Sequence, residues 1–558
     1  MGCAAFLAVT WLERVRDNDN TGAHDMQTNP CTKTSEVRMS LTPPARTRKT
    51  KGAKMSTPST INRRWRVKTA GALALATAVL ATFAIGQETG TLRKPNILLI
   101  YADDLGWGDV GYQSDGRFLT PNIDRLAREG VVFSNSYSCG ANCAPSRASI
   151  LSGGYTARHG LLGNGTDRGP KNHQRLVPIP TKRHLEASFV TMAEALKEAG
   201  YATAHFGKWH VASRDPGTHP SGQGFDVAYH AFSDSTGGGA LKGEGVAGWE
   251  SLTDRKGPPN DPSGVYTMTD KAVEFMASNR NRPFFVYLAH YAIHAGARNA
   301  RPESRQLVAE RGKAANISDL YIANTYDFDD SVGKLLGKLR ELELEDNTLV
   351  VFTSDNGASR DQSLDPVPLS GRKGAFYEGG IRVPLIVRWP GVTQAGATCS
   401  TPVSQVDFYP TFLAAAGVPV PTGTQLDGVS LLPALKQPDG GLNRASIFWH
   451  FPGYIDNPNR ARDPVFGSRP ISVIRKGDWK LHLHHEEWAL DGGRAALATN
   501  NAVELYNLKD DIGEHKNLAL ENTAKRDELL DDLLKWIADI KAPIPTEKNP
   551  AYDPNAKP

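Results

Sequence analysis

The chain has 558 residues, of which 40% are hydrophobic and 22% charged, and this composition supports a large buried core and excludes a disordered or fibrous protein. Its formal net charge is +4, but residues 1–86 hold 13 of the 64 lysines and arginines and only 5 of the 60 aspartates and glutamates. The remaining chain therefore carries a net charge of −4, which excludes a broad basic surface for nucleic acid and leaves any attraction to anions to a local cluster.

Residues 1–86 form a predicted leader. Basic residues at 63, 64, 66 and 68 precede the apolar run 70–85, an order typical of an export signal. A membrane anchor is the alternative, but the run is shorter than the roughly 20 residues that a spanning helix needs. Residues 1–54 show no hydrophobic periodicity, so Met55 is a candidate start. We expect a periplasmic or secreted protein that meets the membrane only during export and signal-peptide cleavage.

The five cysteines are too few for a disulfide scaffold or a zinc array. Cys3 and Cys31 lie in the leader, which leaves Cys139, Cys143 and Cys399 in the body. Whether Cys139 and Cys399 pair is open. An odd number of cysteines in an exported protein indicates a thiol with a special role, and Cys143 is the candidate.

Residues 87–440 are predicted to form an α/β domain. Strand and helix signals alternate from Pro95 onward, which indicates a large, mostly parallel sheet with helices on both faces. The predicted strands are 96–101, 131–133, 201–206, 284–288 and 348–353. The predicted helices are 120–130, 191–200 and 320–339, the second opened by Thr191 and Glu194 as a capping box.

Polar side chains follow four of these strands. Asp103 and Asp104 follow the first, and Asp355 and Asn356 follow the last. Ligands of such sheets bind beyond the carboxyl ends of the strands, so we expect all of these groups to converge on one crevice. The other polar groups follow the remaining two strands: Lys208 and His210 come after the strand 201–206, and His294 comes after the strand 284–288.

The pattern changes near residue 440, and residues 441–545 are predicted to form a smaller α+β domain with an antiparallel sheet. Its strands are 472–474, 480–484 and 503–508, with a turn at Gly477-Asp478 and a helix over 521–540. We interpret His482, His484 and His485 as a partly exposed face rather than as a metal site. Residues 546–558 belong to a Pro-rich stretch that we expect to be a loose tail.

The segment that begins at Cys143 reads C-A-P-S-R-A-S-I-L-S-G, and residues 155–160 read Y-T-A-R-H-G. This segment resembles the C-x-P-S-R signature of the formylglycine-dependent sulfatases, of arylsulfatase type in the alkaline phosphatase superfamily. Gly207-Lys208-Trp209-His210 resembles the G-K-W-H of that family, and residues 371–384 resemble its G-x-K-G-x-x-x-E-G-G block. The resemblance extends from about residue 95 to residue 540.

The resemblance implies an alkaline-phosphatase-like fold and hydrolysis of sulfate esters, with sulfated carbohydrate as the expected substrate. A formylglycine-generating enzyme would oxidise Cys143 to formylglycine, whose hydrate is the nucleophile. One Ca²⁺ would be held by Asp103, Asp104, Asp355, Asn356 and the modified Cys143, because hard oxygen ligands suit this ion. The implied catalytic set is Cys143, Arg147, Lys208, His210 (base), His294 (acid or sulfate contact) and Lys373.

Two departures from the family pattern concern substrate identity. His294 is followed by Ala295-Gly296-Ala297-Arg298 without the usual proline, and His210 is followed by Val211-Ala212 instead of Leu-Gly. We expect both changes near the pocket rim. Two alternative functions stay open: a phosphate or phosphonate ester hydrolase of the same fold, and a catalytically silent protein that binds calcium and glycans.

Overall fold

The computed structural model describes residues 93–114, 116–164, 169–230, 249–251, 258–294, 299–312, 317–359, 368–456, 458 and 463–557. Residues 89–558 form one compact unit, and the predicted leader lies outside the described residues. Within the described ranges, no helix combines the length and the apolar character that a bilayer crossing requires.

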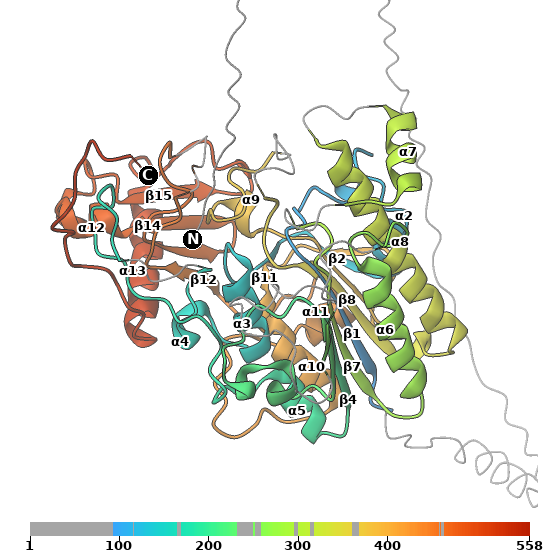
Figure 1. Cartoon of the computed structure of the whole chain (residues 1–558). Coiled ribbons are helices and arrows are strands. Elements are labelled where there is room, and N and C mark those ends of the chain that lie inside the picture. The colour runs from blue at the N-terminus through green and yellow to red at the C-terminus, as the bar shows by residue number, and fades with distance from the viewer. Residues whose placement is uncertain are drawn as a thin grey trace, which may run out of the picture. The chain divides into compact units, whose positions relative to one another are not determined.

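A large sheet crosses the unit (Figure 1). In the described residues it has nine strands in the order β10-β2-β9-β8-β1-β7-β4-β5-β6. All neighbouring strands are parallel except β9, which runs antiparallel to β2 and β8. The mostly parallel sheet predicted from the sequence is therefore confirmed. The strands are β1 (Asn96–Ala102), β2 (Val131–Phe133), β4 (Ala202–Gly207), β5 (Val227–His230), β6 (Trp249–Ser251), β7 (Phe284–Ala289), β8 (Thr348–Ser354), β9 (Leu385–Arg388) and β10 (Ala397–Cys399).

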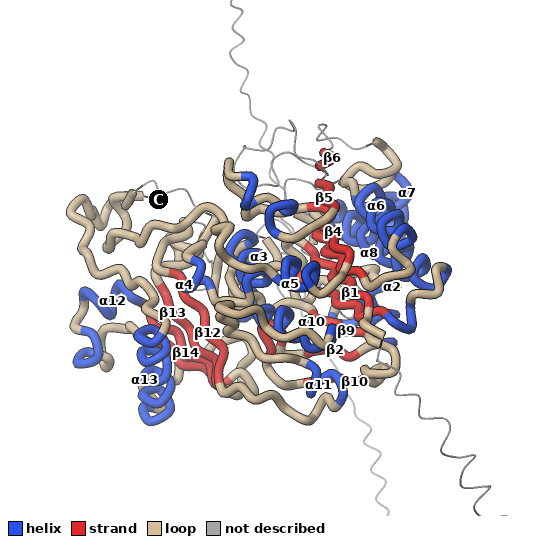
Figure 2. The backbone as a smooth tube through the Cα atoms, turned by 90° about the horizontal axis from the view of Figure 1, so that it is seen from below, coloured by secondary structure: helices blue, strands red, loops and turns tan. Residues whose placement is uncertain are grey.

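Helices cover both faces of this sheet, as Figures 1 and 2 show. The fully buried β1 alternates between two cores: Ile97, Leu99 and Tyr101 join one, and Leu98 and Ile100 join the other. On the second face lie α2 (Pro121–Glu129), α6 (Val265–Ser278), α7 (Pro302–Arg311) and α8 (Asp319–Glu341). On the first lie α3 (Cys143–Ser152), α5 (Met192–Glu198), α10 (Phe408–Ala416) and α11 (Leu432–Lys436).

Local capping follows the sequence signals. The Thr191 side chain accepts from the Glu194 amide, and the Glu194 carboxylate accepts from the Thr191 amide, so the predicted capping box opens α5. Short elements complete the unit: α4 (Thr156–His159), α9 (Glu378–Ile381), the paired strands β3 (Ser136–Tyr137) and β11 (Val403–Ser404), and 3₁₀ turns at Gly111–Gln113, Pro216–Thr218, Pro220–Gln223, Glu345–Asn347, Gln405–Asp407 and Gly493–Ala496.

The predicted C-terminal sheet is also confirmed. Its four antiparallel strands are β12 (Ser446–Phe451), β13 (Ile471–Lys476), β14 (Trp479–His484) and β15 (Val503–Asn507). Gly477 and Asp478 form the two-residue turn between β13 and β14, with Gly477 at φ 58°. The helix α13 (Thr523–Asp539) packs four buried residues against this sheet, while α12 (His485–Leu490) follows β14.

The structure corrects the prediction that the histidines at the end of β14 form a partly exposed face. His482 and His485 are fully buried, not part of an exposed face. Leu481 and Leu483 pack in the core under α13, and the opposite face of β14 carries His482 toward Tyr377. Both faces of the strand are covered, so its alternation of polar and apolar residues does not mark a solvated side.

The structure also corrects the prediction of a loose tail at the end of the chain. Residues 547–553 were expected to be loose, yet their backbone exchanges hydrogen bonds with residues 172–177. The buried Asn549 side chain donates to the carbonyl oxygens of Lys171 and Gln174 at 2.9 and 2.7 Å. This segment is therefore held in place by satisfied polar groups, which composition does not reveal.

Candidate active site

Four neighbouring strands of the large sheet present their carboxyl ends at one place. The order β8-β1-β7-β4 is parallel throughout, with Ala102 level with Ser354 and Gly207 level with Ala289. The groups that follow these strands in the sequence therefore lie together, as the strand pattern predicted.

The backbone at two of these strand ends is unusual. Asp104 and His210 have φ values of 66° and 67°, a left-handed conformation that is uncommon for residues other than glycine. Gly207 precedes Lys208 at φ 104°, and a Cβ there would lie 1.9 Å from the Ala289 carbonyl oxygen. Only glycine therefore lets β4 approach β7 closely enough to place Lys208.

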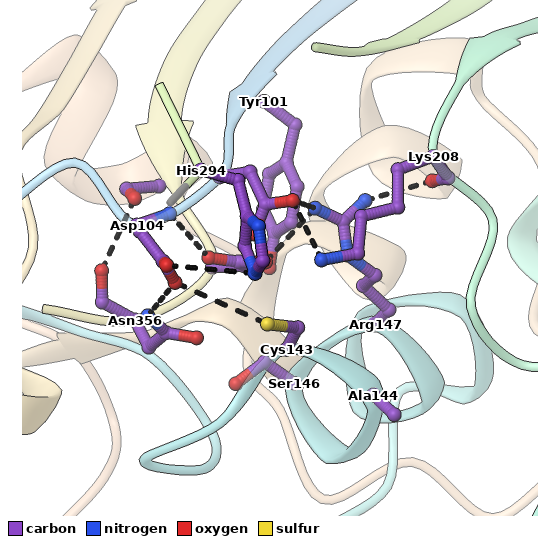
Figure 3. Close-up of polar contacts among 12 residues, drawn as sticks. Tyr101, Asp104, Cys143, Ala144, Ser146, Arg147, Lys208, His294 and Asn356 are labelled. Carbon is purple, nitrogen blue, oxygen red and sulfur yellow. Dashed lines mark hydrogen bonds and ion pairs between the residues drawn. The ribbon is translucent and has the colours of Figure 1, made fainter. Parts of the chain in front are cut away.

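Cys143 is the first residue of α3 and is fully buried. Its Sγ points toward Asp104, 4.0 Å from Oδ1 (Figure 3). Burial disfavours the thiolate, but Lys208 and Lys373 outweigh it and lower the pKa of Cys143 to about 7. The helix N-terminus also favours negative charge at this position. The site is thus built to hold an anionic or strongly polar group on residue 143.

The oxygens around Cys143 fit a cation. Among the described residues, Asp103 Oδ1, Asp104 Oδ2 and Asn356 Oδ1 are buried without a hydrogen-bond partner. Ligand atoms of Asp103, Asp104, Cys143 and His294 all lie within 4.8 Å of one another. Buried oxygens without a donor are costly, and a hard divalent ion such as Ca²⁺ would satisfy them.

The carboxylates show the same need for positive charge. Burial raises the pKa of Asp355 well above its ordinary value, and the negative charges of Asp103 and Cys143 add to this. For Asp103, burial is outweighed by Lys208, His294 and other cations, so its pKa lies well below the ordinary value. One acid is thus kept ionised while its neighbour resists ionisation, the pattern of carboxylates that share too little positive charge.

Arg147 lies one helical turn after Cys143 in α3 and holds neighbouring segments of the site in position. Its Nη2 lies 2.8 Å from Asp355 Oδ2, and its Nη1 donates to the Lys208 carbonyl oxygen at 2.8 Å. The guanidinium also lies over the Tyr101 ring, 5.3 Å from its centroid. The fork of donors therefore ties β8, β4 and α3 together, a task that suits arginine better than lysine.

Two lysines approach the acids from different segments. Lys208 Nζ lies 2.6 Å from Asp103 Oδ2, and Lys373 Nζ lies 2.6 Å from Asp104 Oδ1. The pKa of each lysine is raised, since the neighbouring negative charges outweigh burial. Both amines are therefore charged at neutral pH, and they supply the local positive cluster that the acidic body lacks.

The two histidines have opposite tendencies. Burial, with Lys208 and Arg147, lowers the pKa of His210 well below its ordinary value, so this ring is neutral. Burial acts in the same sense on His294, but Asp103, a hydrogen bond with Cys143, and Asp104 together outweigh it, so the pKa of His294 is raised. His294 Nε2 lies 3.7 Å from Asp104 Oδ2. A neutral ring and one that favours its proton suit a base and an acid, the roles that the resemblance implied.

The departure after His210 lies differently from expectation, and the departure after His294 is not tested. Val211 and Ala212 are buried in the core of the large sheet and not at a pocket rim. Residues 295–298 lie outside the described residues.

In the described residues, Cys139, Cys143 and Cys399 are free cysteines, so Cys139 and Cys399 do not pair.

A cavity of about 530 Å³ beside the site was not foreseen. Asn142, which precedes Cys143, lies in its wall, and Asn164 Oδ1 accepts from the Ala144 amide at 3.0 Å. Two loop segments, 162–181 and 451–456, form most of the lining. The length of the loop between α4 and α5 is the sequence signal that could have indicated it, because long ordered loops are often functional. Its polar lining residues include Asn142, Asn164, Lys171, Gln174, Tyr454 and Asp456.

Together, the sheet, the acids at its strand ends and the buried side chain at a helix N-terminus define an enzyme of the alkaline-phosphatase-like class. Residues 95–418 match the family model described as Sulfatase, and residues 372–542 match the model described as N-sulphoglucosamine sulphohydrolase, C-terminal. The chain therefore belongs to the sulfatase family, within the alkaline phosphatase superfamily. Its relatives are named sulfatases, which are sulfuric ester hydrolases.

Individual relatives agree with this assignment. A sulfatase of Formosa agariphila is 32% identical over 520 residues, which are 81% of this chain and 88% of the relative. The N-acetylgalactosamine-6-sulfatase of Homo sapiens is 35% identical over 379 residues, 65% of this chain and 69% of the relative. The crystal structure of Ps i-CgsB in complex with k-i-k-neocarrahexaose has a TM-score of 0.64 at 28% identity and covers 81% of this chain and 94% of that chain.

Proposed function

We propose that this sulfatase hydrolyses sulfate esters of carbohydrates, with a formylglycine hydrate made from Cys143 as nucleophile and one bound calcium ion. The observation that carries the proposal is the position of Cys143: it opens α3, is buried, and lies among the charges of Asp103, Asp104, Lys208 and Lys373. The relatives support the substrate class, since one is named for N-acetylgalactosamine-6-sulfate and another was solved with a neocarrahexaose.

Asp103, Asp104, Asp355, Asn356 and residue 143 would hold the ion. When bound, calcium would supply a Lewis acid that acidifies a hydroxyl, and its charge would offset that of the carboxylates so that the site can receive an anionic ester. A hydrated aldehyde supplies two hydroxyls on one carbon, so that one can attack sulfur and the other can later expel sulfate.

The side chains of the chain itself have distinct tasks in this proposal. Lys208 and Lys373 bind and orient the sulfate group, for which compact ammonium groups are suited. His210, kept neutral, accepts the proton of the second hydroxyl, and His294, whose pKa is raised, donates a proton to the leaving oxygen. Arg147 holds Asp355 and the Lys208 backbone in position.

Two alternatives predict different behaviour. A phosphate or phosphonate ester hydrolase of this fold would process phosphate esters at least as fast as sulfate esters. A silent calcium- and glycan-binding protein would bind sulfated sugar without turnover, as expected if Cys143 stays unmodified. The proposal also includes export, maturation by a formylglycine-generating enzyme, and a periplasmic or secreted location.

Matched esters of one alcohol test the reaction. With 4-nitrophenyl sulfate and 4-nitrophenyl phosphate, we expect kcat/KM to favour the sulfate by at least about 100-fold. Protein from its own host is the material of choice, and the mass of the Cys143 peptide reports the fraction that is modified. Faster phosphate turnover by fully modified protein would contradict the proposal, and so would no turnover of either ester.

The cavity beside Cys143 bears on substrate size. Lys171 contacts Asp456 across its two loop walls, and His173 Nε2 lies 3.1 Å from Asp456 Oδ1. Its volume is in the range of small-ligand pockets, and its amide and hydroxyl groups suit sugar hydroxyls. The slightly acidic body offers little attraction to a long polyanion.

We therefore expect preference for a terminal sulfated sugar or a short oligosaccharide. Sulfate release should be faster, per sulfate group, from di- to hexasaccharides than from the intact polymer, by about tenfold or more. Ion chromatography of released sulfate, with 4-nitrophenyl sulfate as the control for intact chemistry, gives the measurement. Faster release of internal sulfates from the polymer would refute the terminal-sugar preference and leave the sulfatase reaction standing.

A further inference from the structure

Two strands of the C-terminal sheet bring together a group of metal-ligand side chains outside the active site. His482 and His484 share one face of β14, and Glu504 on β15 pairs directly with His482. Glu504 Oε2 lies 3.7 Å from His482 Nδ1 and 3.7 Å from His484 Nε2. All three ligand atoms lie within 4.8 Å of one another.

The ring of His482 is buried beside the other two ligand side chains. Its side chain has no exposed surface, and within the described part of the chain Nδ1 has no hydrogen-bond partner, while Nε2 faces the Glu514 carboxylate at 3.4 Å. A buried imidazole nitrogen without a hydrogen-bond partner is costly, because burial removes the water that would otherwise bind it. The Glu504 Oε2 atom lies 3.7 Å from Nδ1, too distant for a hydrogen bond but suitably placed for a shared ion.

The surroundings have the supporting contacts that metal ligands require. Behind His482, Nε2 lies 3.4 Å from Glu514 Oε1, so that a ring bound through Nδ1 would direct its N–H at a carboxylate. The hydroxyls of Tyr377 and Tyr506 donate to Glu504 Oε2 at 2.7 and 2.9 Å, which fixes the carboxylate. Ligating histidines and carboxylates are commonly oriented in this way.

We propose that His482 Nδ1, His484 Nε2 and the Glu504 carboxylate form a binding site for a zinc ion or a similar first-row divalent ion. Ligands about 2.0–2.1 Å from tetrahedral zinc lie about 3.3 Å apart, so the observed 3.7 Å separations need only a small movement. Two imidazoles and one carboxylate favour such an ion over calcium, in contrast to the oxygen-rich active site.

The fourth position has room for water. His484 and Glu504 line a cavity of about 220 Å³, which Tyr377, Glu487 and Asn501 also border. The site shares no residue with the active-site set, but it is linked to it through the chain. Tyr377 adjoins the buried Glu378, which binds Lys480 Nζ at 2.9 Å. A bound ion would therefore join β14 to β15 beside Tyr377, whose hydroxyl donates to Glu504.

Metal binding to purified full-length chain tests the site without reference to activity. After chelation and dialysis, Zn²⁺ titration by calorimetry should show one site per chain that Asp355→Asn leaves intact. Substituted Co²⁺ should give the strong visible absorption of a tetrahedral nitrogen-ligated ion. His484→Ala and Glu504→Gln should each weaken Zn²⁺ binding by about 100-fold or more. His515→Ala, which removes an exposed histidine of the same region, is the matched control.

Circular dichroism establishes that each variant is folded, and Glu504→Gln provides the test if His484→Ala is not. Zinc affinity that is equal in wild type and both variants would overturn the proposal. Absence of Zn²⁺ binding in the wild type would do so as well, and would leave His484 and Glu504 as an ordinary ion pair. Loss of the zinc site in Asp355→Asn would place the ion in the active site instead.

Discussion

Cys143→Ala should lower turnover of a sulfate ester by on the order of 10⁶-fold while the protein stays folded. The side chain lies at the start of α3 and is buried among charged groups. The nearby Ala144 and Ala148 belong to a hydrophobic core cluster, but Cys143 does not. Removing one sulfur atom leaves a small cavity, for which we expect a destabilisation of about 1 kcal/mol. Steady-state kinetics and urea unfolding give the two measurements.

Cys143→Ser separates the role of the second hydroxyl from that of the first. Serine can supply one hydroxyl for attack but cannot expel sulfate afterwards, so we expect at most one turnover and a mass increase of one SO₃ group on the peptide. Multiple turnovers by the alanine variant would remove Cys143 from the reaction. Global unfolding of that variant would support a purely structural thiol.

Asp355→Asn should weaken calcium binding by at least about 100-fold and lower kcat/KM by about 10³-fold. The substitution keeps the size of the side chain but removes the charge that faces Arg147 Nη2 at 2.8 Å. It also replaces one of the carboxylate oxygens that we propose as ligands of the ion. Calorimetric titration of Ca²⁺ into chelated protein measures the affinity, and assays across a wide range of Ca²⁺ concentration measure the rescue.

Asp329→Asn is the control, because Asp329 is also a buried aspartate but accepts from the backbone amides of Asn122 and Ile123, away from the active site. It should reduce stability without changing calcium affinity. Thermal unfolding adds an independent reading: calcium at about 100 times its Kd should stabilise wild type by about 2.7 kcal/mol, and Asp355→Asn far less. Full calcium affinity in Asp355→Asn would exclude this side chain as a ligand.

Much of the active site was predictable because it depends on local signals repeated along the chain. Each of the four strands that meet at the site is a buried run of six or seven residues, and polar groups such as Asp103 and Asp355 follow these strands. Parallel pairing of neighbouring strands then brings these ends together by geometry alone. The Cys143 signature and the Lys208-Trp209-His210 segment add the residues that we propose as the reacting groups.

Other features depend on contacts between distant segments. Lys373 reaches Asp104 across 269 positions of sequence, and among the described residues between Ser354 and Leu385 there is no strand that would place it. Asn549 is buried because the segment 171–177 offers backbone partners to residues 547–553. No periodicity or composition records such a match.

The sequence by itself determined the class of fold, the order of the main strands and helices, and the chemistry-bearing residues at the strand ends, because each follows from a pattern within a few residues. Only the tertiary structure decided that the face of β14 bearing His482 is covered, that the end of the chain supports the wall of the cavity, and that Val211 and Ala212 lie in the core. The physical reason is that burial depends on what packs against an element. For β14 those partners are α13 on one side and the Tyr377 segment on the other, both far away in the chain.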